Sequence, residues 1–206
     1  MAEQSTRDRI VTEAIRLFAE RGFRGTTVGD IERAAGLAPR SGGLYKHFRS
    51  KEEVLEAAAE RHVAEIEAVR SLLELGPLGD LRAELTLLAR WTLAELRAER
   101  PLLKIVQKDG DQFPELIEAV RERVIKTGHA TATEVVERLF GEYGVAVADP
   151  NALASVALAA LVGRDLEEMI FRHTPGGLDE EEFIEAWVDL WMAFANANRK
   201  VEVTAR

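Results

Sequence analysis

The sequence contains no cysteine, so the chain can form neither disulfide bonds nor thiolate metal sites. That composition fits the reducing cytoplasm. No segment approaches the roughly 18 consecutive apolar residues of a transmembrane helix, and no membrane partner is expected. The N-terminal residues MAEQSTRDRIVTEA lack an apolar run after a basic start, so a secretory signal peptide is not expected either. Together these absences predict a soluble, cytoplasmic protein.

Basic residues are in the minority, because 27 Lys and Arg oppose 36 Asp and Glu and leave a formal net charge of −9. They are not evenly spread. Residues 1–50 contain nine basic and six acidic side chains, a net charge of +3, and residues 51–206 carry −12. This asymmetry favours an anionic partner for the N-terminal part alone. Chance variation among solvated side chains is the alternative explanation.

The alternating pattern of a β-strand is also missing, and apolar residues recur at helical spacing throughout the chain. Ile10, Ala14, Leu17 and Phe18 form one such apolar face. Glycines and prolines mark the breaks between successive helices, so the later helices are expected over 80–99, 102–108, 114–140, 151–172 and 180–198. The chain is therefore predicted to be all-α, with about nine helices.

The stretch AGLAPRSGGLYKHF, residues 35–48, places three glycines and a proline between two helical patterns. A short helix, a glycine-containing turn and a second short helix form a helix-turn-helix, whose second helix enters the major groove of DNA. With Leu44 and Phe48 turned inward, the opposite face of that helix presents small and basic-capable residues, namely Gly42, Gly43, Lys46 and His47.

Other residues near this motif are also candidates for DNA contact. Arg40 and Ser41 precede the second helix in the turn, where they can reach phosphate or base, and Tyr45 lies on its flank. Thr27 and Lys51 stand at helix N-termini, which attract anions. A loop-rich corner of an ordinary helical bundle is the alternative interpretation of this region.

Several segments resemble the TetR family of repressors, in the family's order and without a large gap. They include AIRLFAERGF (14–23), GTTV (25–28), LYKHF (44–48) and SKEEVL (50–55), so the resemblance covers about residues 5–60. It implies a homodimer that reads a palindromic operator in double-stranded DNA and releases it when a small-molecule effector binds. Carried onto the matching positions, the resemblance assigns DNA contact to Thr27, Gly43, Tyr45, Lys46, His47 and Lys51.

The turn of this motif departs from the family. Between Gly36 and Tyr45 the chain is two residues longer than the family's usual form. Where the recognition helix begins, and whether Arg40 and Ser41 face bases or backbone, therefore stays open. The organisation expected from the resemblance is a three-helix DNA-binding domain over 1–52, a larger helical bundle for effector binding and dimerisation over 53–200, and a tail over 201–206.

Two helices near the C-terminus have the composition of a subunit interface, because aromatic residues on one accompany a ridge of small residues on the other. In the family, the last two long helices of each subunit pair into a four-helix dimer bundle. The residues assigned to this interface are Leu153, Val156, Ala157, Ala160, Phe183, Trp187, Leu190, Trp191 and Phe194. Packing within a single chain is the alternative role for them.

The effector pocket is expected among the helices from Leu81 to Leu139, since small-molecule sites are mostly apolar with a few polar groups. Its candidate lining residues are Trp91, Ile105, Phe113, Val120, Val124 and Thr127. A helical enzyme, or a metal-responsive regulator using His129 or His173, is the rival interpretation of this part. Neither a catalytic motif nor a metal-ligand spacing supports it, so no enzyme activity, metal or cofactor is expected.

Overall fold

The computed structural model describes residues 5–58, 60–61, 64, 78–110 and 114–199. Seven α-helices are bounded within these residues, 51–58 are helical as well, and β pairing is limited to an isolated bridge between Val145 and Arg199. The all-α prediction is confirmed. None of the described helices has the length and apolar character needed to cross a membrane.

The chain divides into two compact units. Residues 1–65 and 99–127 form an N-terminal unit, and residues 66–98 and 128–206 form a C-terminal unit. The N-terminal unit thus contains a segment from the middle of the sequence. The functional boundary expected between residues 52 and 53 stays a prediction.

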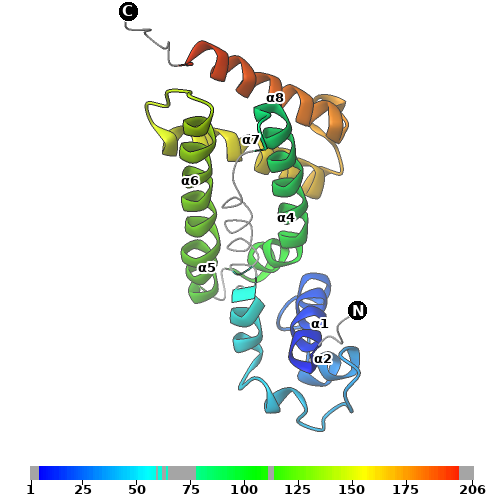
Figure 1. Ribbon diagram of the computed structural model, residues 1–206. Coiled ribbons are helices and arrows are strands. Elements are labelled where there is room, and N and C mark those ends of the chain that lie inside the picture. The colour runs from blue at the N-terminus through cyan, green and yellow to red at the C-terminus, as the bar shows by residue number, and fades with distance from the viewer. Residues whose placement is uncertain (1–4, 59, 62–63, 65–77, 111–113, 200–206) are drawn as a thin grey trace, which may run out of the picture. The chain divides into compact units, whose positions relative to one another are not determined.

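The N-terminal unit begins with two helices whose ends are set by their own side chains (Figure 1, blue). Helix α1 (Thr6–Arg21) starts where the Ser5 hydroxyl accepts from the Asp8 N–H, and it stops at Gly22, whose φ is 82°. Helix α2 (Val28–Ala34) follows, and then a single 3-10 turn, η1 (Leu44–Lys46), precedes the helix over 51–58. Turns at these ends bring apolar faces of successive helices together.

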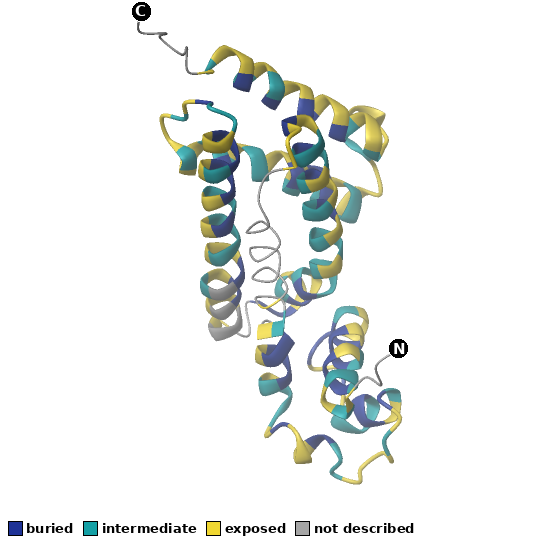
Figure 2. Cartoon of the chain, in the orientation of Figure 1, coloured by how far each residue is buried: buried dark blue, intermediate teal, exposed yellow. Residues whose placement is uncertain are grey.

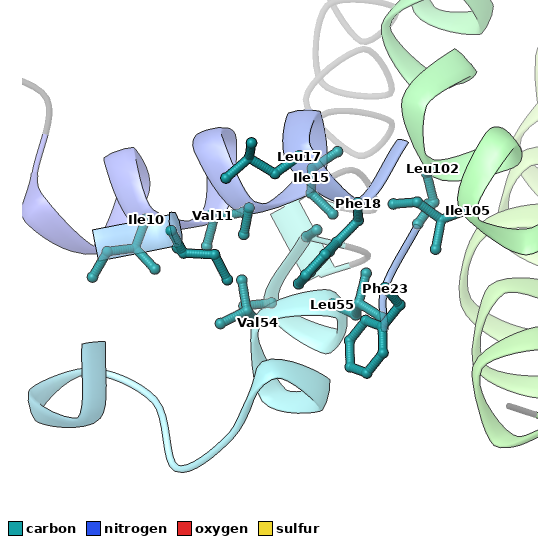
Figure 3. Packing of buried hydrophobic residues seen from close by; sticks show 14 of the residues in the cluster. Ile10, Val11, Ile15, Leu17, Phe18, Phe23, Val54, Leu55, Leu102 and Ile105 are labelled. Atoms are coloured by element: carbon teal, nitrogen blue, oxygen red, sulfur yellow. The ribbon is translucent and has the colours of Figure 1, made fainter. Parts of the chain in front are cut away.

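One apolar core holds the N-terminal unit together (Figure 3). Phe18 and Ile105 are completely buried, and Phe23 and Leu102 nearly so. The last part of α4 (Leu81–Asp109) supplies Leu102 and Ile105, while Val120 and Val124 come from α5 (Pro114–Val120) and the π-helical segment η3 (Arg121–Ile125). The N-terminal helices therefore share their core with residues some hundred positions away in sequence.

The C-terminal unit is built from the first part of α4 with α6 (Lys126–Glu142), α7 (Pro150–Phe171) and α8 (Glu180–Ala197). Asp149 caps α7, and a capping box between Asp179 and Glu182 starts α8. Buried residues lie along one side of α8 and exposed residues along the other (Figure 2). The core of this unit contains Leu93, Phe140 and Trp187.

The structure corrects two expected helix boundaries. Helix α4 continues through Pro101, whereas the sequence analysis expects separate helices over 80–99 and 102–108. A proline inside a helix removes one N–H donor and crowds the preceding turn, so it predicts a break. Here buried apolar residues on both sides of the proline, Leu93 before it and Leu102 after it, stabilise the helical backbone through tertiary packing.

The other correction concerns the second helix of the helix-turn-helix. A short helix that includes Gly42 and Gly43 is expected from the sequence, but the described structure has only the 3-10 turn at Leu44–Lys46. Gly42 has a φ of 73°, which is incompatible with a right-handed helix. Glycine's low helix propensity leaves too few good helix formers in this stretch for a longer helix.

We expect Pro101→Ala to raise the free energy of unfolding by about 1–2 kcal/mol, because alanine restores the missing donor and removes the ring from the preceding turn. Lys104→Ala changes an exposed side chain of the same helix and should shift this free energy by less than about 0.5 kcal/mol. Urea unfolding monitored by circular dichroism measures both variants. A lower value for Pro101→Ala would contradict the expectation.

Candidate nucleic-acid interface

Thr27 fixes the start of α2. Its hydroxyl accepts from the Asp30 N–H at 3.2 Å, and the Asp30 carboxylate accepts from the Thr27 N–H at 3.1 Å, which completes a capping box. The Thr27 hydroxyl also donates to the Asp30 carboxylate at 2.5 Å. This hydrogen bond is the largest cause that lowers the pKa of Asp30. Thr27 itself is exposed, so its side chain stands at a solvent-facing helix N-terminus.

The turn after α2 opens with a Schellman motif. Gly36 has a φ of 74°, and the N–H groups of Gly36 and Leu37 donate to the carbonyls of Arg33 and Glu32 at 3.2 and 2.7 Å. Further along, the Ser41 N–H donates to the Ala38 carbonyl at 3.2 Å across a tight turn. These bonds define the backbone path from α2 to η1.

Most of the residues predicted to contact DNA are exposed, whereas Gly42, Gly43 and Lys51 are half-buried. Leu44 and Phe48 are buried, whereas the Tyr45 side chain is 59% exposed. Arg40, Ser41, Lys46 and His47 are also exposed. The segment therefore turns its apolar residues into the core and offers hydroxyl, imidazole and cationic groups to solvent. Such groups form hydrogen bonds and ion pairs with phosphate oxygens and base edges.

Arg40 lies beside the first turn of α2. A Cβ atom placed on Gly29 would lie 3.5 Å from Arg40 Cγ and 3.9 Å from Thr27 Oγ1. Both are ordinary van der Waals distances, so the Arg40 stem lies close to Gly29 near the helix N-terminus. Through this contact the structure brings Arg40 and Thr27, two of the predicted DNA contacts, to the same end of α2.

Lys51 is more constrained than the other predicted contacts. Its ammonium donates to the carbonyls of Phe23 and Thr26, both at 2.8 Å, and lies 4.3 Å from the centroid of the Phe23 ring. Burial is the main cause that lowers the pKa of Lys51. Two of its three N–H donors thus hold the backbone between α1 and α2 in place.

Two residues at the end of α4 also form hydrogen bonds to the backbone at the end of α1 and just after it. Lys108 donates to the carbonyls of Ala19 and Glu20 at the end of α1, and the buried Asp109 carboxylate accepts from the Phe23 N–H at 2.8 Å. Lys108 and Asp109 are not among the site residues predicted from the sequence. No local pattern could have identified them, because 86 residues separate Asp109 from Phe23.

Glu32 is the other residue that the sequence analysis missed. Its side chain is completely buried, and its two carboxylate oxygens accept from the N–H groups of Arg40, at 2.6 Å, and Leu44, at 3.2 Å. A signal was present, since Glu32 follows Val28 by four residues and so falls on the inward side of α2. A charged residue at such a position calls for buried partners.

The predicted pocket residues fall in both units. Ile105, Val120 and Val124 are buried in the core of the N-terminal unit, and the half-buried Thr127 belongs to the same unit. Trp91 is half-buried in the C-terminal unit. Phe113 lies outside the described residues. Among the side chains that the structure describes, no three His, Asp or Glu residues form a group able to hold a metal ion.

The capping box predicts an acid-dependent contribution to stability. Because the pKa of Asp30 is lower in the folded chain than the ordinary value of 3.8, ionised Asp30 stabilises the fold above that value. This contribution is lost as the pH falls through the folded pKa. The difference in unfolding free energy between the wild type and Asp30→Ala should thus be full at neutral pH and shrink below about pH 4. Urea unfolding across this range tests it, and a pH-independent difference would contradict it.

Comparison with known proteins identifies the N-terminal part of the chain. Residues 10–58 match the family described as bacterial regulatory proteins, tetR family. The HTH-type transcriptional repressor KstR2 of Mycolicibacterium smegmatis is 48% identical over 52 residues, which are 25% of this chain and 24% of that protein. The chain thus matches only about a quarter of the length of such curated relatives. Their names describe transcriptional regulators.

Solved structures resemble the chain over nearly its whole length. Reduced NemR of Escherichia coli aligns with a TM-score of 0.70 at 22% identity, covering 92% of this chain and 97% of NemR. A transcriptional regulator from Rhodococcus aligns with a TM-score of 0.67 at 21% identity, covering 96% of this chain and all of that one. At such identities the likeness concerns the fold. Residues 10–58 thus match the tetR family of bacterial regulatory proteins, and the chain shares the fold of these solved regulators.

Proposed function

We propose that this chain is a cytoplasmic, ligand-responsive transcriptional repressor without enzyme activity. It binds a palindromic DNA operator as a homodimer, and a small, largely apolar effector releases it. The observation that carries the proposal is the exposed set of Arg40, Tyr45, Lys46 and His47 on a buried, hydrogen-bonded helix-turn-helix core. Thr27, Ser41, Gly42, Gly43 and Lys51 complete the proposed DNA contacts.

The two last helices support dimerisation, because each leaves an apolar stripe exposed. On α7 the stripe consists of Val156, Ala159, Ala160 and Gly163, and on α8 of Ala186, Leu190, Ala193 and Ala197. The spacing within each set places its members on one helix face. Small residues permit close approach of a second pair of helices, and the side chains of Val156 and Leu190 are 64% and 71% exposed.

The other residues assigned to the interface pack in or against the core of the C-terminal unit. Trp187 and Trp191 are buried within the chain, where the Trp187 indole N–H donates to the Ala157 carbonyl at 3.2 Å. Leu153, Ala157, Phe183 and Phe194 are half-buried against the same core. We propose that the aromatic side chains hold α8 on α7, and that the exposed stripes meet the second subunit.

The burial of the proposed pocket residues suggests how an effector would act. Ile105, Val120 and Val124 pack in the same apolar core as Phe18 and Phe48. An apolar molecule that displaced these side chains would disturb the core that supports the DNA-contacting turn. Trp91, Phe113 and Thr127 remain proposed lining residues on the strength of the sequence.

The function is tested by selecting bound duplexes from a random DNA pool with the purified full-length chain. Recovery of a palindrome with two half-sites, spaced by whole helical turns, is the expected result. Binding should also weaken steeply as salt is added, since phosphate contacts release counterions. Failure to enrich any sequence at low salt would overturn the proposal.

Lys46→Ala should weaken binding to the selected duplex and to unrelated duplexes alike, because phosphate contact is independent of sequence. It should also reduce the slope of log affinity against log salt by about 0.9 for each phosphate that the dimer no longer neutralises. Lys104→Ala removes an exposed cation elsewhere in the same unit and is the matched control. Fluorescence anisotropy titrations measure both, and an unchanged slope would mean that Lys46 does not bind phosphate.

Leu190→Glu should dissociate the dimer, because it introduces a charge into the exposed stripe of α8 without touching the buried core. Leu87→Glu makes the same change at a 54% exposed site of α4 in the same unit and should leave the dimer intact. Sedimentation velocity distinguishes the species. A dimer of the Leu190 variant as stable as the wild type would place the interface elsewhere.

A further inference from the structure

We infer that Glu32 is a positioning residue for DNA recognition, because its buried carboxylate holds the turn that presents Arg40 and the residues of η1. The inference rests on the proposed function, in which this turn contacts DNA. Glu32 itself has no exposed surface and cannot touch DNA in the described arrangement. Its effect is therefore exerted through the backbone that it binds.

The burial of Glu32 requires donors around its carboxylate. A carboxylate removed from water is costly unless hydrogen bonds replace its hydration. Glu32 obtains two of them from the backbone, since Oε2 accepts from the Arg40 N–H at 2.6 Å and Oε1 from the Leu44 N–H at 3.2 Å. Each oxygen thus holds one end of the segment 40–44.

The backbone of Glu32 contributes a third contact. Its carbonyl accepts from the Leu37 N–H at 2.7 Å as part of the Schellman motif. One residue therefore fixes the chain at three successive points, Leu37, Arg40 and Leu44, between the end of α2 and the start of η1. All three hydrogen bonds end on one residue of α2. The position of that helix therefore sets the position of the whole connection between α2 and η1.

The conformation of Arg40 shows why such support is needed. Its φ is 62°, a region that non-glycine residues avoid. Pro39 before it and the Ser41-to-Ala38 hydrogen bond around it match the pattern of a type II turn, whose third position ordinarily takes glycine or asparagine. The Glu32 carboxylate accepts from the N–H of this unfavourably placed residue.

Glu32 positions the proposed DNA-binding groups in two places. At Arg40 it anchors the backbone from which the side chain reaches Gly29 and the N-terminus of α2. At Leu44 it anchors the first residue of η1, which carries the exposed Tyr45 and Lys46. Binding to phosphates on DNA requires a fixed spacing between these groups. Loss of either hydrogen bond allows the backbone between them to move, so this spacing is no longer fixed.

Glu32→Gln is the variant that tests this inference, because it keeps the size of the side chain. The amide has a single acceptor oxygen, so its NH₂ group faces one of the two backbone N–H donors. Leu17→Ala is the control, since it weakens the core of the same unit at a residue of α1, outside the turn. Both are compared with wild type at a temperature where circular dichroism shows each to be folded.

Two measurements on the full-length chain separate positioning from general stability. Hydrogen exchange followed by mass spectrometry should show faster exchange over residues 37–46 in Glu32→Gln, beyond any change in Leu17→Ala. Affinity for the duplex selected by the wild type should fall by about tenfold or more in Glu32→Gln, and by less than about threefold in the control. The salt slope should also be smaller in Glu32→Gln, because the variant neutralises fewer phosphates.

The outcomes distinguish this inference from the proposed function. If the wild type selects no duplex, both are overturned. If the wild type binds and folded Glu32→Gln binds equally well with an equal salt slope, only the positioning role is overturned. Should Glu32→Gln fail to fold, Glu32→Asp serves instead, because it keeps the charge but retracts the carboxylate by one methylene. Wild-type affinity in Glu32→Asp would likewise overturn the role.

Discussion

The apolar core around Phe18 is the interaction on which the proposed function depends. It buries residues of α1, α2, η1 and the helix over 51–58 together with Leu102 and Ile105 from the end of α4. A helix-turn-helix of this length has little apolar surface to bury by itself, and small domains are correspondingly marginal. The distant segment enlarges that core, so the turn proposed to contact DNA packs on residues from the middle of the chain.

Hydrogen bonds from polar side chains then give this core a definite geometry. Lys108 binds carbonyls at the end of α1, Lys51 and Asp109 bind the backbone between α1 and α2, and Glu32 binds the backbone after α2. Apolar packing is non-directional, whereas each of these hydrogen bonds requires its donor and acceptor to be aligned. The exposed residues proposed to contact DNA thus extend from loops whose backbone is fixed on its inner side.

Several features were predictable because they depend on near neighbours in the chain. The capping box at Thr27 and Asp30, the stop at Gly22 and the inward side chains of Leu44 and Phe48 all follow from local spacing. The prediction of a helix break at Pro101 was wrong. Proline locally disfavours a helix, but the burial of apolar residues on both sides of it outweighs this preference. Tertiary packing overrides propensities of a few kcal/mol in this way.

The sequence by itself determined the all-α fold and the uneven distribution of charge, since these depend on periodicity and composition. Only the tertiary structure decided which buried groups support the turn proposed to contact DNA and which apolar residues of α7 and α8 remain exposed. The contact between Asp109 and Phe23, and the division of α8 between buried Trp187 and exposed Leu190, arise when distant segments pack. Local patterns carry no information about such partners, because the spacing of residues along one helix is independent of what packs against it.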